Sequence, residues 1–141
     1  MSQNTANSPL KPAIWRCAVP SPLRRAFDYL PPEGCHAAAK PGARVTVPFG
    51  KRSVTAVILS IRSESPVAPA KLKAATALLD AQPLFTEKQR ALLSWAADYY
   101  QHPLGEVLPL GLSPRERRGQ PERALTETGI RLTARGQGLP D

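Results

Sequence analysis

Several residues of this chain are of types that could bind a ligand. They are the acid Asp28, its aromatic neighbours Phe27 and Tyr29, the glycine Gly50 and the lysine Lys73. A carboxylate such as Asp28 accepts a charge-assisted hydrogen bond from a hydroxyl group and repels a phosphate. An aromatic side chain can stack on a nucleic-acid base, and a glycine lets the backbone approach a ligand closely. Of these, Asp28 suits a hydroxyl group such as the one at the 3′ end of a nucleic-acid strand, and Lys73 suits a phosphate.

Each of these residues also has an ordinary structural role, which the sequence leaves open. Asp28 can cap the turn after its strand, and Phe27 and Tyr29, which share one side of that strand, can be core aromatics. Gly50 can serve only the turn in which it lies, and a lysine is most often a solvated surface charge. No nucleophile lies at a useful spacing from a base, so an enzyme is the weakest interpretation.

The charge balance indicates a polyanionic partner. The 141 residues include 19 Lys and Arg against 11 Asp and Glu, a net charge of +8, and most of the excess lies in residues 1–112. Nucleic acid is the commonest partner of such a protein, although charge reports on partners and not on fold. Lys51, Arg52 and Lys71 are the candidates for phosphate contacts, which set affinity without sequence preference.

The elements that must position these residues are short strands. Alternating and β-branched stretches predict them at 13–19, 27–30, 42–47 and 53–62, with a closing strand at 72–80. Turns are expected at 31–34 and 48–51, and a proline-containing loop at 63–70. Five short strands joined by Pro/Gly turns predict a small curled β-barrel of the oligonucleotide-binding (OB) type rather than an open sheet.

One amphipathic helix is predicted after the strands, which makes the fold class mostly β with a capping helix (α+β). Thr86 and Gln89 have the spacing of a capping box, and Pro103 requires the helix to end near His102. The predicted apolar face recurs at i, i+3, i+4 and i+7. We expect this face to pack on the barrel, and it consists of Leu92, Trp95, Ala96 and Tyr99.

No metal or cofactor is expected. The cysteines, Cys17 and Cys35, and the histidines, His36 and His102, have no zinc-binding spacing, and Cys17 stands in an apolar run as a small core residue. Residues 1–12 are polar, which predicts a disordered start without the features of a signal peptide. No apolar segment reaches the length of a membrane span, so a cytoplasmic protein with no membrane partner is expected.

Three segments in a fixed order carry a family resemblance: RAFDYL at 25–30, VPFGKR at 47–52 and WAADYYQHPLGE at 95–106. Together they resemble the amino-terminal DNA-binding region of the primosomal protein N-prime family, the bacterial replication-restart helicases. The resemblance covers residues 13–112 and implies a domain that reads DNA 3′ ends. It implies that Asp28 accepts a hydrogen bond from the 3′-hydroxyl group. The other residues that it implies for the pocket of the terminal nucleotide are Phe27, Tyr29, Gly50 and Lys73.

The remaining machinery of that family has no counterpart in this sequence. There is no GxxxxGK[ST] phosphate loop, acidic Walker-type pair or set of zinc-ligand cysteines, so no ATPase or other enzyme activity is expected. Residues 113–141 resemble the truncated start of a winged-helix domain and bury too little apolar surface to fold alone. The expected partner is single-stranded or forked DNA with a free 3′ end; replication-restart proteins and single-strand-binding protein would contact the missing parts. The alternative is a general basic β-barrel that binds RNA or the ribosome without end preference.

Overall fold

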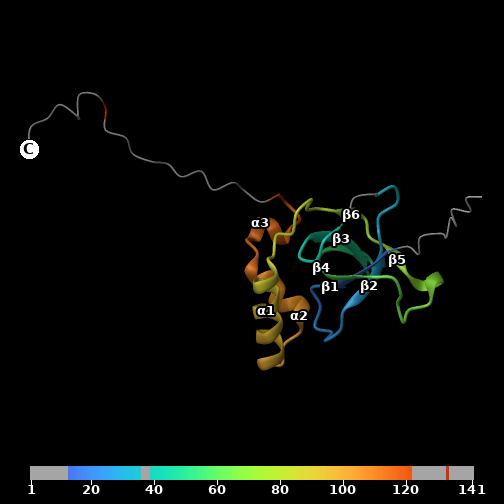
Figure 1. Ribbon diagram of the computed structural model, residues 1–141, viewed down its shortest axis with the longest axis horizontal. Coiled ribbons are helices and arrows are strands. Elements are labelled where there is room, and N and C mark those ends of the chain that lie inside the picture. The colour runs from blue at the N-terminus through green and yellow to red at the C-terminus, as the bar shows by residue number, and fades with distance from the viewer. Residues whose placement is uncertain (1–12, 36–38, 122–132, 134–141) are drawn as a thin grey trace, which may run out of the picture.

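The computed structural model describes residues 13–35, 39–121 and 133 and has a curled sheet with short helices along one side (Figure 1). The predicted disordered segment 1–12 lies outside the described residues. The sheet has six strands in the order β5-β2-β1-β4-β3-β6. Its four main strands are β1 (Ile14–Ala18), β2 (Phe27–Leu30), β3 (Arg44–Phe49) and β4 (Arg52–Arg62), close to the strands predicted from the sequence.

The two edges of the sheet are formed by neighbouring pieces of chain. β5 (Lys73–Ala74) runs parallel to β2, and β6 (Ala77–Leu78) runs antiparallel to β3. Because these pieces lie next to each other in sequence and at opposite ends of the strand order, the sheet curls into a half-barrel, an OB-like α+β fold. The prediction of one continuous strand over 72–80 was therefore wrong, since the segment changes partner from β2 to β3 midway.

The β3–β4 hairpin is tighter than predicted. Phe49 pairs with Arg52, so the connecting loop is only Gly50 and Lys51, and the predicted four-residue turn at 48–51 was too long. Gly50 has φ 62°, the left-handed backbone that a glycine at the first loop position gives to a two-residue hairpin. Pro48 therefore stays within β3, beyond the short pairing of β3 with β6.

The core lies inside the curl of the sheet. Cys17 is fully buried there, as its apolar surroundings predicted, and it packs with large residues from neighbouring strands. Burial of these side chains is the main stabilising contribution to a domain of this size. The buried members of this cluster are Trp15, Cys17, Val19, Tyr29, Ala43, Val45, Val47, Ala56, Ile58 and Ala75.

Four short helical elements follow the sheet in sequence. The longest is α1 (Glu87–Tyr99), which begins with the predicted capping box between Thr86 and Gln89. It ends three residues before the predicted boundary at His102. The elements after it, which the sequence analysis did not predict, are α2 (Leu104–Val107), the 3-10 turn η2 (Leu108–Gly111) and α3 (Pro114–Arg117).

The predicted packing face of α1 was wrong. Leu92, Trp95 and Tyr99 are 62%, 57% and 66% exposed, whereas Ala97 is 3% exposed and Leu93 packs in a second apolar cluster. The reason is that α2 and η2 lie against the sheet and supply the cover themselves. This second cluster joins β1 and β4 to the chain around the helices, and its buried members are Ala18, Val57, Phe85, Leu108 and Leu112.

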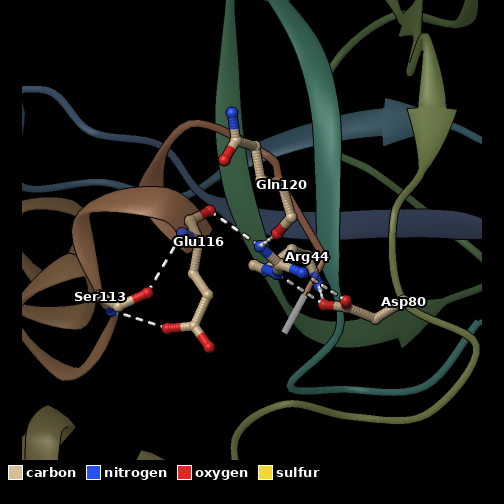
Figure 2. Close-up of polar contacts among 5 residues, drawn as sticks. All are labelled: Arg44, Asp80, Ser113, Glu116 and Gln120. Atoms are coloured by element: carbon tan, nitrogen blue, oxygen red, sulfur yellow. Dashed lines mark hydrogen bonds and ion pairs between the residues drawn. The ribbon is translucent and has the colours of Figure 1, made fainter. Parts of the chain in front are cut away.

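A buried arginine ties the end of the described chain to the sheet (Figure 2). The side chain of Arg44 in β3 is 0% exposed, and it donates to both carboxylate oxygens of Asp80, at 2.9 and 2.7 Å. Its Nη1 also donates to the backbone carbonyls of Glu116 and Gln120, at 2.8 and 2.7 Å. The packed structure thus continues past residue 112, where the sequence analysis placed the domain boundary, and most of the predicted tail lies outside the described residues.

Candidate nucleic-acid interface

A cavity of about 440 Å³ opens beside β2, between the β3–β4 hairpin and the loop that leads to β5. Six of the eight candidate site residues line it, although they come from three separate parts of the chain. Lys51 and Arg52, at the tip of the hairpin, are exposed and do not line it. The six candidates brought together are Phe27, Asp28, Tyr29, Gly50, Lys71 and Lys73.

Asp28 is held in place by two residues that the sequence analysis missed. Arg16, its cross-strand partner on β1, donates from Nε to Oδ1 at 2.9 Å and from Nη2 to Oδ2 at 3.2 Å. The hydroxyl of Ser65 donates to Oδ2 at 2.6 Å. Pairing β1 with β2 in sequence would have placed Arg16 opposite Asp28, but no local signal identifies Ser65, which lies 37 residues away from Asp28.

These contacts keep Asp28 ionised. The hydrogen bond from Arg16 lowers the pKa of the Asp28 carboxyl below its ordinary value, and the bond from Ser65 and the charge of Arg62 act in the same direction against the effect of burial. An ionised carboxylate only accepts hydrogen bonds. Asp28 can therefore bind a hydroxyl donor and is unsuited to act as an acid.

The aromatic residues around the cavity have two roles: some form its wall and one belongs to the hydrophobic core. Tyr29 is 4% exposed and its hydroxyl donates to the Pro48 carbonyl at 3.0 Å, so it is a core residue that also borders the cavity. Burial raises the pKa of Tyr29 to about 12. Phe27 is half-buried and packs edge-to-face with Phe49, which the sequence analysis missed, with ring centroids 5.2 Å apart. The guanidinium of Arg25 lies 4.9 Å from the Phe27 ring centroid.

The charged residues of the cavity are mostly basic. Arg16, Arg25, Lys71 and Lys73 line it, and within the described part of the chain Asp28 is the one acid among its lining residues. Such a site attracts an anionic ligand as a whole and contains one carboxylate as a charged hydrogen-bond acceptor. Its cations suit the phosphates of a nucleotide, and Asp28 suits a hydroxyl group.

Within residues 13–35, 39–121 and 133, no group of three or more His, Cys, Asp or Glu side chains is placed to hold a metal ion. Among the helices of the same residues, none is long and apolar enough to cross a membrane.

Comparison with known families identifies a DNA-binding domain. Residues 16–113 match the profile of a family described as the 3'DNA-binding domain (3'BD) of PriA. The matched segment includes every one of the eight candidate site residues as well as Arg16 and Ser65.

Comparison with characterised proteins finds replication restart proteins. The chain is 39% identical over 124 residues to the replication restart protein PriA of Haemophilus influenzae, an alignment that covers 88% of this chain and 17% of that protein. It is 35% identical over 76 residues to the replication restart protein PriA of Bacillus subtilis, covering 54% of this chain and 9% of that protein. The chain therefore corresponds to less than a fifth of the length of these relatives.

Proposed function

This chain belongs to the PriA 3'DNA-binding domain family, and from that premise we propose that it binds the 3′-hydroxyl end of single-stranded or recessed DNA in replication restart. The observation that carries the proposal is the position of Asp28, an ionised carboxylate in a cavity whose other charged lining residues are all cations. In a cavity that attracts phosphates, a carboxylate repels any internal nucleotide. It is favourable only where the strand has a hydroxyl group in place of a phosphate, which is its 3′ end.

The hydroxyl of Ser65 marks where the strand's own hydroxyl would bind. The Asp28 side chain is only 2% exposed, because Arg16 and Ser65 cover it. Arg16 is fixed by two bonds to the carboxylate, whereas Ser65 makes one and lies on the exposed loop between β4 and β5. A 3′-hydroxyl that takes the place of the Ser65 hydroxyl keeps the same kind of bond to Oδ2.

The remaining cavity residues suit the rest of a terminal nucleotide. Phe27 and Phe49, packed edge-to-face, give the cavity an aromatic wall beside the Arg25 guanidinium, and an aromatic wall accepts any base without preference. Gly50 leaves the hairpin wall without a side chain, and nothing lies within 4 Å of the place where its Cβ would be. Lys71 and Lys73 are placed to contact phosphates at the rim, and Lys51 and Arg52 extend the basic surface along the hairpin.

The contribution of this chain is binding. Its 141 residues contain no phosphate-binding loop. In a longer protein that also has a helicase motor, this domain would position that motor at the nascent 3′ end of a stalled fork. That role places it in the cytoplasm, and single-strand-binding protein and other restart proteins would meet parts outside this chain. The competing candidate, a basic barrel that binds RNA or the ribosome, predicts no dependence on the chemistry of the end.

The test compares one fluorescent oligonucleotide that ends in a 3′-hydroxyl with the same strand that ends in a 3′-phosphate. Binding is measured by anisotropy. A hydrogen bond to a charged acceptor is worth about 1.5–3 kcal/mol, so the wild type is expected to prefer the hydroxyl end by about ten- to a hundredfold. Asp28→Ala should abolish that preference, while Glu33→Ala, which removes an exposed carboxylate outside the cavity, should keep it.

Ser65→Ala tests the exchange of hydroxyl groups within the same experiment. If the 3′-hydroxyl replaces the Ser65 hydroxyl, removing the internal donor should tighten binding of the hydroxyl-ended strand and leave the phosphate-ended strand unchanged. Equal affinity of the wild type for the two ends would refute the proposed function. Weaker binding of the hydroxyl end by Ser65→Ala would instead show that Ser65 supports the bound state.

A further inference from the structure

A second cavity, of about 200 Å³, adjoins the first. Arg25 and Ala26, in the connection between β1 and β2, line both cavities. The far side of the second cavity is formed by the end of α1 and the start of α2. The two cavities therefore share the β1–β2 connection as a wall, and a path from one to the other crosses it at Arg25 and Ala26.

Arg25 stands at the boundary between the cavities. Its guanidinium lies over the Phe27 ring, 4.9 Å from the centroid, and a cation held on an aromatic face keeps its charge available on its other side. Arg24, the next residue, lines the second cavity, and its Nη1 donates to Oε1 of Gln101 at 3.2 Å. Both arginines thus line the second cavity, and guanidinium binds phosphate through paired N–H groups.

The second cavity has an apolar floor beneath these charges. Ala18, Leu59, Ala97 and Leu104 contribute to it. The acid that lines it is Asp98, and the imidazole of His102 is paired with Glu106 at 2.9 Å. Two arginines against one aspartate leave the path basic, and the floor offers apolar area to a sugar or a base.

We propose that the second cavity is a binding subsite for the nucleotide on the 5′ side of the terminal one, and that Arg25 binds the phosphate that joins the two. This rests on the proposed function, because it takes the first cavity as the place of the terminal nucleotide. A phosphate between the two nucleotides lies where the cavities meet, which is the position of Arg25. The strand then leaves over Arg24 toward the end of α1. The alternative is that the strand leaves over Lys51 and Arg52 at the hairpin tip, but these two residues line neither cavity.

The test uses charge-removing variants of similar size on the full chain. Arg25→Gln and Arg24→Gln address the proposed path, and Arg52→Gln addresses the exit over the hairpin. Arg115→Gln is the matched control, because this exposed arginine on α3 lines neither cavity. All four side chains are exposed, so the melting temperatures should stay close to that of the wild type.

The probe is a short oligothymidylate with a 3′-hydroxyl, with and without a neutral methylphosphonate at the linkage next to the terminal nucleotide. Arg25→Gln should weaken binding of the all-phosphate probe about tenfold and make the slope of log K against log salt less negative by about 0.7. The wild type should bind the methylphosphonate probe more weakly than the all-phosphate probe by a similar factor. Arg25→Gln should bind the two probes with nearly equal affinity. Arg24→Gln should behave similarly but less strongly, and Arg115→Gln should match the wild type.

The outcomes separate this proposal from the proposed function. If Arg25→Gln keeps the preference for a 3′-hydroxyl end but loses affinity and salt slope, both proposals stand. If the wild type shows no end preference, the proposed function fails whatever the arginine variants do. Wild-type affinity for Arg25→Gln, or a loss confined to Arg52→Gln, would overturn the second subsite.

Discussion

Removing Asp80 is the sharpest test of how this domain is held together. Arg44 is fully buried, and the Asp80 carboxylate is the acid paired with it (Figure 2). Asp80→Ala leaves the guanidinium with the carbonyls of Glu116 and Gln120 but without a counter-charge. It also removes the acceptor of the Arg44 backbone N–H, which donates to Oδ2 at 2.8 Å. The variant thus leaves a buried charge without a counter-charge and a backbone donor without its acceptor.

The expected loss in the free energy of unfolding follows from that geometry. Breaking a buried ion pair by removing one partner costs about 3–5 kcal/mol, because the remaining charge is desolvated and unpaired. For a domain of this size such a loss lowers the melting temperature on the order of 10–20 °C. The double variant Arg44→Met/Asp80→Leu should recover part of it, since no buried charge is left.

The assay is urea unfolding followed by far-ultraviolet circular dichroism. The matched control is Glu106→Ala, which also removes a carboxylate, but one whose partner is the exposed imidazole of His102, and should cost less than about 1 kcal/mol. Asp80→Ala should lower the midpoint without changing the slope. Equal losses of unfolding free energy for Asp80→Ala and Glu106→Ala would refute the reasoning. Such a result would mean that water reaches Arg44 or that another acceptor takes the place of Asp80.

Two further predictions concern titrating groups. Cys17 is fully buried and burial raises its pKa to about 12, so a thiol reagent at pH 8 should modify half-buried Cys35 first and Cys17 only as the protein unfolds; equally fast reaction of both thiols would contradict this. The pKa of Asp28 is lower in the folded state than its ordinary 3.8, mainly through Arg16. Its ionised form therefore stabilises the fold above pH 3.8, and this contribution is lost as the pH falls through the lowered value. The stability gap between wild type and Asp28→Asn should be constant from pH 7 to pH 5 and shrink below pH 3.8, and a gap that widens on acidification would contradict the assigned cause.

The sequence by itself determined the features that rest on local signals. The alternating and β-branched stretches placed β1, β2 and β4 within one or two residues. The capping box of Thr86 and Gln89 placed the start of α1, because both hydrogen bonds join residues three apart. The charge balance and the three family segments indicated a nucleic-acid partner before any contact was known.

Only the tertiary structure decided which surfaces those elements bury. The heptad-like spacing of Leu92, Trp95 and Tyr99 describes a face, but α2 and η2 occupy the sheet surface that this face would have covered. The segment at 72–80 carries no mark of its change of partner, because that change depends on how far the sheet curls.

The candidate site divides in the same way. Its aspartate, its aromatics and its glycine could be identified from the sequence, since they lie in the short motifs at 25–30 and 47–52, whereas Lys71 and Lys73 were identified only as residue types. Their common cavity, the locking of Asp28 by Arg16 and Ser65, and the second cavity at Arg25 were not visible. They depend on the register of β1 with β2 and on a loop and a helix end far away in sequence. Spacing along a chain specifies which side of an element a residue takes, and only the packing of elements against one another specifies what that side faces.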